Sequence, residues 1–217
     1  MVFVQAKIDG LYIKPLTPKK VGEQFQLKYQ ATQGTNLTYF VHFQNKVYYQ
    51  HSDRVELISK LLSSDRPGVF NILINATNHI TGIIVKKIVV IIEDPILDLQ
   101  IHSPLSNTNF EVGEEFQFCY SIKQGSNPHF TPEFDQNVLA LKPEDTKGKL
   151  IEGGFQLCFK HSFDLHANFT KGDAQLNMNL TLTAKNNVSE LVKEVNVVLL
   201  KPVNDIKMHS FLSLIHI

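Results

Sequence analysis

The stretch VGEQFQLKYQATQGTN at residues 21–36 recurs as VGEEFQFCYSIKQGSN at residues 112–127, with nine of sixteen positions identical and no gap. Because chance rarely gives such a match, we infer that a unit of the chain has been duplicated. The offset of 91 residues is the size of a small domain and is too long for a solenoid repeat. The sequence therefore predicts tandem small domains, an organisation that favours an array over a single catalytic cleft.

The duplication continues downstream. ILINATNHIT (72–81) shares the pattern A-x-N-x-[IV]-[ST] with LTLTAKNNVS (180–189), and KKIVVIIEDPILDL (86–99) matches KEVNVVLLKPVNDI (193–206). In the last pair the offset has grown to 107, so the second copy contains about sixteen additional residues. We expect most of them in NVLALKPEDTKGKLIEGG (137–154), whose proline, glycine and charge predict a long surface loop.

Apolar and polar residues alternate with a period of two in both copies. The apolar members are Phe25, Leu27 and Tyr29 in the first copy and Phe116, Phe118 and Tyr120 in the second. Such alternation buries one face of a strand, and no segment has the pattern of a three-turn amphipathic helix. We predict an all-β protein of two antiparallel two-sheet sandwiches, at residues 1–94 and 95–203, with 204–217 beginning a further repeat.

Charge and motif content exclude several function classes. The net charge is +0 and the pI is about 7.1, so the chain lacks the basic surface of a nucleic-acid binder. No apolar run approaches the roughly 18 residues of a membrane span. The apolar segment within the first residues, MVFVQAKIDG, is too short for the apolar core of a signal peptide.

Catalytic and metal-binding patterns are also absent. The nine histidines have no H-x-x-x-H spacing, and there is no C-x-x-C pair, G-x-S-x-G elbow or Gly-rich phosphate loop. Glu93 and Asp94 at the junction of the copies could contact calcium, but they fall short of the six to eight oxygens that this ion requires. We expect no enzyme activity, no metal and no cofactor.

The motif PGVFNILINATN (67–78) resembles the P-G-x-[YF]-x-[VI]-x-[VIL]-x-A-x-N signature of the PKD (polycystic kidney disease) repeat, an immunoglobulin-like β-sandwich. The V-G-E openings at Val21 and Val112 resemble the first core strand of that repeat, and CFKHSF (158–163) resembles its V-x-H-x-[YF] strand. The linkers EDPILDL (93–99) and KPVNDI (201–206) look like junctions between consecutive repeats of polycystin-type receptors.

The chain departs from this family at one strand. The W-D-F-G-D-G segment is reduced to YFVHFQN (39–45) and FTPEFDQN (130–137), and Val41 and Pro132 stand where the core tryptophan would be. Such divergent copies resemble the arrays of large animal polycystin-like proteins. The resemblance implies a non-catalytic extracellular adhesion or mechanical spacer segment of a membrane glycoprotein. Its partners would be neighbouring repeats and an extracellular protein or glycan ligand.

An alternative is a carbohydrate- or protein-binding accessory module of a secreted hydrolase. A row of exposed aromatic residues would support that reading, whereas most aromatic residues here alternate in phase with the core. The full-length reading frame would separate the two functions.

The sequence contains more glycosylation sequons than its composition predicts. N-x-[ST] occurs at five asparagines where about two are expected: Asn36, Asn75, Asn168, Asn179 and Asn187. Asn75 and Asn179 have outward parity on their strands, and the others fall in predicted turns or loops, so we expect all five to be able to carry a glycan. This placement favours an extracellular location, and the resemblance to polycystin-type receptors implies the extracellular face of a membrane protein.

The two cysteines alternate out of phase with their core neighbours. Cys119 follows Phe118 and Cys158 follows Leu157, so both side chains are expected on the outer face of the second sandwich. In immunoglobulin-like topology the strands that carry them are neighbours in one sheet. We expect a cross-strand disulfide, which requires a Cα separation below about 7 Å; two free thiols are the alternative.

The last six residues, LSLIHI (212–217), resemble the translation of a transposon-based sequencing-library adapter. We therefore expect the sequence to come from a truncated transcript, with the signal and membrane segments of the parent protein lying outside it.

Overall fold

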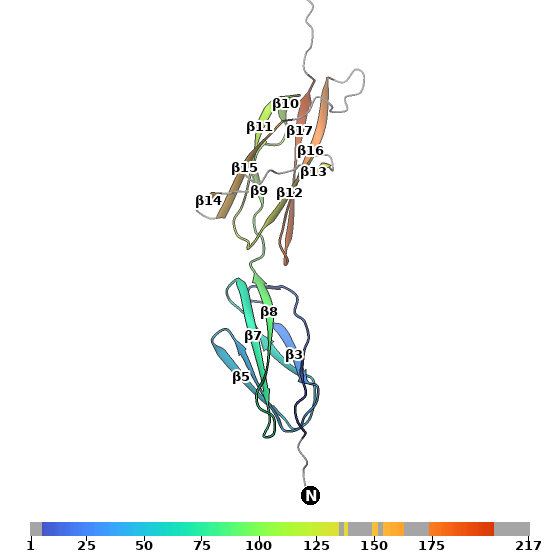
Figure 1. Ribbon diagram of the computed structural model, residues 1–217. Helices are drawn as coiled ribbons and strands as arrows, with labels where there is room; N and C mark the ends of the chain where they lie inside the picture. Colours follow the sequence, from blue (N-terminus) through green and yellow to red (C-terminus); the bar gives the residue numbers. More distant parts are fainter. Residues whose placement is uncertain (1–5, 135–136, 139–148, 152–153, 163–173, 202–217) are drawn as a thin grey trace, which may run out of the picture. The chain divides into compact units, whose positions relative to one another are not determined.

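The computed structural model describes residues 6–134, 137–138, 149–151, 154–162 and 174–201, and within these it contains strands and no helix (Figure 1). The all-β prediction is therefore confirmed. The chain forms two compact units. The first contains Met1–Asp98, Lys123–Phe130 and Ala184–Leu191, and the second contains Leu99–Ile122, Thr131–Thr183 and Val192–Ile217.

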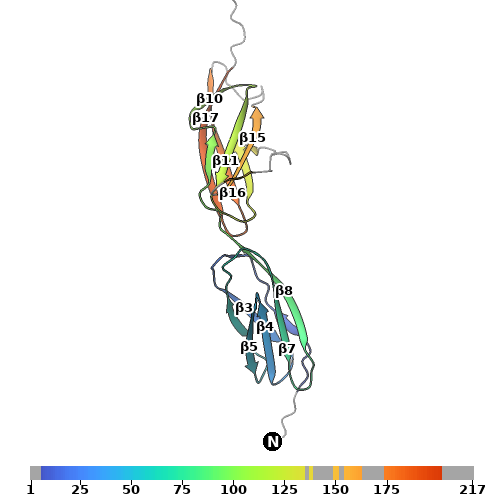
Figure 2. The same ribbon diagram turned by 90° about the vertical axis from the view of Figure 1, so that its left-hand side faces the viewer.

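The first sandwich consists of two sheets, which the two views in Figures 1 and 2 show from different sides. One sheet has the order β1-β3-β6 and the other β2-β8-β7-β4-β5. The strands are β1 (Leu11–Ile13), β2 (Lys19–Lys20), β3 (Phe25–Ala31), β4 (Leu37–Phe43), β5 (Lys46–Ser52), β6 (Ile58–Leu62), β7 (Gly68–Thr77) and β8 (Ile84–Glu93).

The core of this sandwich follows the predicted alternation. Phe25, Leu27 and Tyr29 of β3 are buried, and Ile72 and Ile74 of β7 are fully buried in the opposite sheet. Burying one such side chain contributes about 1.5–3 kcal/mol. The buried side chains that line the core are Ile8, Leu11, Ile13, Phe25, Leu27, Tyr29, Ala31, Leu37, Tyr39, Val41, Phe43, Ile58, Leu62, Ile72, Ile74, Ala76, Val90 and Ile92.

Two buried tyrosines add polar groups to this core. The Tyr39 hydroxyl accepts a hydrogen bond of 3.0 Å from the Ala31 N–H, which satisfies it inside the sandwich. Burial raises the pKa of Tyr29 from 10.0 to about 12, with a smaller contribution from Tyr39, whose ring centroid lies 5.3 Å away.

The second sandwich repeats the arrangement with sheets β14-β15-β11-β9 and β10-β17-β16-β12-β13. Its core contains Phe116, Phe118 and Tyr120 from β11, as predicted, and Leu180 and Leu182 from β16. The strands are β9 (Gln100–Ser103), β10 (Thr108–Glu111), β11 (Glu115–Ile122), β12 (His129–Phe134), β13 (Asn137–Val138), β14 (Lys149–Ile151), β15 (Gly154–Ser162), β16 (Gln175–Lys185) and β17 (Glu190–Leu200).

The segment 137–154 was expected to be one long loop, and this prediction is wrong where the structure describes it. Asn137–Val138 pairs with β12 and Lys149–Ile151 pairs with β15, because edge strands at both sheets offer unpaired backbone groups. The remaining residues of that segment, apart from Gly154 at the start of β15, lie outside the described part of the chain.

Each sandwich pairs an early short strand in parallel with its last strand. β2 pairs with β8 over two positions, Lys19 with Ile92 and Lys20 with Glu93. β10 pairs with β17 over four positions, from Thr108↔Val197 to Glu111↔Leu200. This pairing places the second strand and the last strand of each sandwich side by side in one sheet.

The repeated stretch also repeats backbone angles. Gly34 and Gly125 have φ of 135° and 148°, and Asn36 and Asn127 both have φ of 48°. Such positive φ values favour Gly and, secondarily, Asn, which explains why the Q-G-[ST]-N ending of the stretch is retained in both copies.

Candidate functional site

Several positions of the motif that resembles the PKD signature have a structural role. Gly68 begins β7 with φ of 145°, a conformation that glycine adopts without strain. Ile72, Ile74 and Ala76 alternate inward and are fully buried. The motif ends at Asn78, just past the end of the strand, where its side chain serves a different purpose.

The Asn78 side chain links three segments of the chain by hydrogen bonds. Its Nδ2 donates to the carbonyls of Ala6 at 2.8 Å and Thr35 at 3.1 Å. Its Oδ1 accepts from the backbone N–H groups of Ile80 at 3.1 Å and Thr81 at 2.8 Å. One amide therefore satisfies four backbone groups that no strand pairing reaches.

Asn186, the corresponding residue of the second copy, does the same within the first compact unit. Its Nδ2 donates to the carbonyls of Asp94 and Ser126 at 2.8 and 2.9 Å, and its Oδ1 accepts from the N–H groups of Val188 and Ser189. The sequence showed the shared A-x-N pattern without revealing this role. The signal was present, since a polar residue retained after an alternating strand is typical of a side chain that bonds the backbone.

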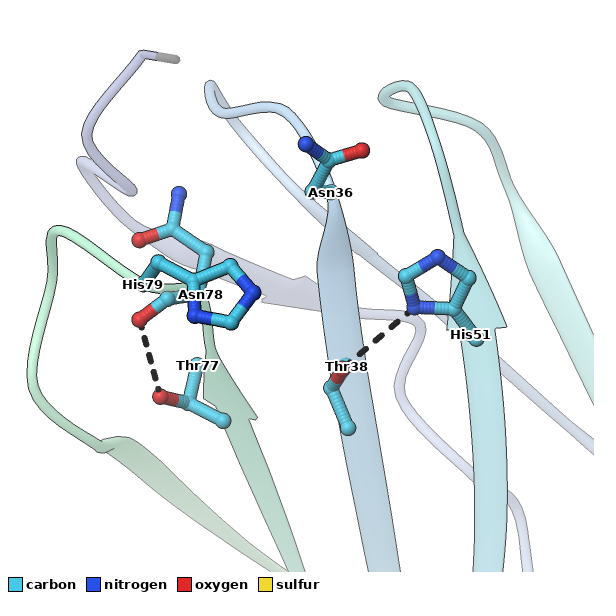
Figure 3. A pocket seen from close by; sticks show the side chains of 6 residues that line it. All are labelled: Asn36, Thr38, His51, Thr77, Asn78 and His79. Carbon is cyan, nitrogen blue, oxygen red and sulfur yellow. Dashed lines mark hydrogen bonds between the residues drawn. The ribbon is translucent and has the colours of Figure 1, made fainter.

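An open depression of about 400 Å³ lies beside Asn78 (Figure 3). It is lined by Asn36, Thr38, His51, Thr77, Asn78 and His79. Figure 3 shows the Thr38 side chain, on β4, directed toward His51 on β5. The Thr38 Oγ1 and His51 Nδ1 atoms are 3.4 Å apart, and His51 Nε2 lies 3.1 Å from Asp53 Oδ1.

This Thr–His–Asp sequence lacks what a catalytic triad requires. The Asp53 side chain is 87% exposed and the His51 side chain 46%, so water competes for both groups. A triad needs a buried carboxylate that holds the imidazole in one orientation. The depression is therefore a polar surface feature suited to weak contacts, and it gives no support to catalysis.

The sequons occupy different environments. Asn36 lines the rim of the depression, and Asn75 and Asn179 are half-buried on the outward-facing sides of β7 and β16. The Asn187 Nδ2 donates at 2.9 Å to Oε1 of the buried Glu93, so a glycan there would have to share a nitrogen that already makes a contact. Asn168 lies outside the described residues.

The cysteines lie on neighbouring strands. β11 and β15 are antiparallel with Cys119 opposite Cys158, and this strand pairing confirms the predicted neighbourhood. The Cα atoms are 4.1 Å apart and the sulfurs are joined at 2.12 Å. Cys158 is exposed, whereas Cys119 is only 8% exposed because β9 continues beside it, with Ser103 opposite.

Glu93, one of the two acidic residues near the junction, is hydrogen-bonded within the protein. Both carboxylate oxygens of Glu93 accept hydrogen bonds of 2.9 Å from Asn187, one from its backbone N–H and one from its Nδ2. Within the described ranges there is no group of three or more His, Cys, Asp or Glu side chains that could hold a metal ion. The carboxylate of Glu93 therefore acts as a hydrogen-bond acceptor.

No protein-family model matches the sequence, and no curated protein matches it. Among solved structures, the chain is similar to the ICAM-5 D1–D4 ectodomain fragment, with a TM-score of 0.62 at 12% identity over 89% of this chain. The match spans about half of that fragment, 54% of its length.

Two further structures match at lower scores. Sidekick-1 immunoglobulin domains 1–5 match 89% of this chain and 40% of their own at 14% identity and a TM-score of 0.47. The fibronectin(III)-like modules of Clostridium thermocellum CbhA match 88% of this chain and 94% of their own at 10% identity and 0.43. At these identities only the fold is shown: tandem immunoglobulin-like β-sandwiches. In the part of the chain that the structure describes, no helix could cross a membrane.

Proposed function

We propose that this chain is a segment of the ectodomain of a larger polycystin-like membrane glycoprotein, built from PKD-type repeats, and that it acts as a non-catalytic adhesion or mechanical spacer. The observation that carries the proposal is that one kind of sandwich is repeated in a single chain. At the same aligned position of the two copies, Asn78 and Asn186 each form side-chain hydrogen bonds to the backbone. Its partners would be neighbouring repeats and an extracellular protein or glycan.

The parallel pairing at the ends of each sandwich supports a mechanical role. When an early strand and the last strand are parallel neighbours, opposite pulls on the two ends load their hydrogen bonds together, in shear. The second sandwich has four such positions and the first has two. We therefore expect both sandwiches to resist stretching and the second to resist more.

An extracellular location is supported by two kinds of residue. The Cys119–Cys158 pair has the strand neighbourhood that a cross-strand bridge needs, and such bridges persist in oxidising compartments. The sequons at Asn36, Asn75 and Asn179 lie at accessible or outward-facing positions. The zero net charge gives no basis for a nucleic-acid partner.

Single-molecule stretching of the chain between flanking marker domains tests the mechanical proposal. We expect two separate unfolding events, one for each sandwich, with the larger force for the second. Extension of either sandwich without measurable force would contradict a spacer that carries load.

A second candidate function, carbohydrate binding by an accessory module, is favoured by one observation. Phe40 and Tyr49 place two rings on the outer face of the first sandwich, with centroids 5.7 Å apart, and Tyr49 is 63% exposed. Aromatic faces bind the apolar sides of sugars. Retention of the chain on a polysaccharide column, lost on Tyr49→Ala, would favour this function over adhesion.

A further inference from the structure

We propose that Asn75 carries an N-linked glycan whose first sugars cover an apolar patch on the outer face of the first sandwich. The patch, called here the outer patch, consists of Phe40, Val47, Tyr49, Leu73 and Val85. The inference rests on the proposed extracellular function, because N-glycans are attached in the secretory pathway.

The strand register places Asn75 in the middle of the outer patch. Phe40 on β4 lies directly opposite Asn75 on one side, and Val85 on β8 lies directly opposite on the other. Tyr49 follows Phe40 in the same row, on the edge strand β5. Directly opposed residues have Cβ atoms about 4.5–5.5 Å apart, so this row is continuous across four strands.

Four of the five side chains of the outer patch are exposed, and Phe40 is half-buried. The exposed fractions are 63% for Tyr49, 58% for Val47, 57% for Val85 and 37% for Leu73. The rings of Phe40 and Tyr49 meet edge to face at 63°. His42 lies between Val47 and Leu73 in the neighbouring row, so the apolar side chains surround two polar ones, His42 and Asn75. Exposed apolar side chains grouped in this way indicate a surface that something covers.

The second sandwich is an internal control for this exposure. In the alignment of the two copies, Thr131, Thr181 and Thr183 stand where the first has Phe40, Leu73 and Asn75. The three threonines are half-buried on strands of the equivalent sheet. At these three positions the fold is formed without an apolar outer residue, whereas Val192, which aligns with Val85, is also apolar and 51% exposed. The difference between the two sandwiches therefore lies around Phe40, Leu73 and Asn75.

The Asn75 side chain has the chemistry for the attachment. Its Nδ2 lies 3.3 Å from His42 Nε2, and its Oδ1 makes no hydrogen bond within the described residues. In transfer from a polyprenyl-pyrophosphate oligosaccharide, Nδ2 bonds to the anomeric carbon and loses one proton, while the carbon–oxygen bond to the pyrophosphate breaks and polyprenyl pyrophosphate leaves. The remaining N–H can still donate to His42.

The dimensions of the glycan fit the outer patch. The two N-acetylglucosamine residues that begin an N-glycan extend about 10 Å, which is about two strand spacings of 4.8 Å. From Asn75 on β7 they reach Phe40 on the neighbouring strand and Tyr49 on the next. Their axial C–H groups would then contact the two rings.

The experiment begins with the full chain secreted from animal cells behind a heterologous signal peptide. Glycopeptide mass spectrometry measures occupancy at Asn75, Asn36 and Asn179. Asn75→Gln is compared with Asn179→Gln, the matched change on the outward side of β16 in the second sandwich. Binding of a fluorescent apolar dye and sedimentation velocity report exposed apolar surface and self-association.

We expect high occupancy at Asn75, a severalfold rise in dye binding for Asn75→Gln, and no rise for Asn179→Gln. Trimming the glycan to its first two sugars should keep dye binding low, because these two sugars reach both rings. Tyr49→Ser added to Asn75→Gln should reverse the rise, which separates exposure of the patch from misfolding.

Four results would overturn the inference. If Asn75 is unoccupied while Asn36 or Asn179 is glycosylated, the inference fails and the extracellular proposal stands. If no sequon of the secreted chain is occupied, both fail. If Asn75 is occupied but Asn75→Gln leaves dye binding unchanged, or if the glycosylated chain dimerises through the patch, the glycan does not cover it.

Discussion

Removing the Cys119–Cys158 disulfide should destabilise the second sandwich and leave the first unchanged. The bond joins residues 39 apart in the sequence. Closing a loop of this length lowers the entropy of the unfolded chain enough to contribute about 4 kcal/mol to the unfolding free energy. The pair Cys119→Ala and Cys158→Ser tests this, because alanine adds no polar group at buried Cys119 and serine meets water at exposed Cys158.

The same perturbation has a geometric signature in single-molecule stretching. While the bond holds, the chain between the cysteines cannot extend beyond the 4.1 Å that separates their Cα atoms. Without it, 39 additional residues extend at about 3.6 Å each, so the second unfolding event should lengthen by about 140 Å. The first sandwich contains no cysteine, and its event is the control within each trace.

Two outcomes would refute this reasoning. Equal unfolding lengths with and without reductant would show that the two cysteines are not bonded in the native protein. A longer event combined with an unchanged midpoint of chemical denaturation would show that the loop-entropy argument fails for this sandwich.

Three further predictions concern the first sandwich. Asn78→Ala removes four hydrogen bonds to the backbone and should lower the unfolding free energy by about 2–4 kcal/mol in urea, whereas exposed Asn71→Ala should change it little. Gly34→Ala would place a Cβ 2.8 Å from Leu37 Cδ2 at φ of 135°, and should cost about 1–3 kcal/mol in the same assay. Because the pKa of Tyr29 in the folded state is about 12 against 10.0, the folded state retains a proton that the unfolded chain releases. The unfolding free energy should therefore be unaffected by this group below pH 10 and fall as the pH rises from 10 towards 12, and Tyr29→Phe should reduce that fall.

Much of the fold could be predicted because its determinants are local. The alternation in the repeated stretch identified which side of β3 and β11 is buried, since the side-chain period of a strand is two. The same alternation anticipated the neighbourhood of Cys119 and Cys158 once a sandwich topology was assumed. The short strands β13 and β14 were missed, because proline, glycine and charge in segment 137–154 predict a loop, whereas pairing to an existing sheet edge is a non-local effect.

The retained asparagine was a signal for a side chain that bonds the backbone, but the distant partners of Asn78 could not be derived from sequence, for a related reason. Its partners at Ala6 and Thr35 are 72 and 43 residues away, and no local pattern specifies such contacts. The outer patch was likewise not visible in the sequence. The alternation places Phe40 and Tyr49 on the outward side of their own strands, but it does not show that the two residues are neighbours. Only the pairing of β4 with β5 and β7 shows that their rings lie in one row beside Asn75.

The sequence by itself determined that the chain is a duplicated all-β protein and which residues face the two cores, because the alternation of buried and exposed residues is a property of single strands. Only the tertiary structure decided which outward residues become neighbours. That choice depends on strand order and register, which are set by contacts between segments far apart in the chain. The hydrogen bonds of Asn78 and the apolar surroundings of Asn75 both depend on these distant contacts. Experiments on these two residues therefore test the proposed function directly.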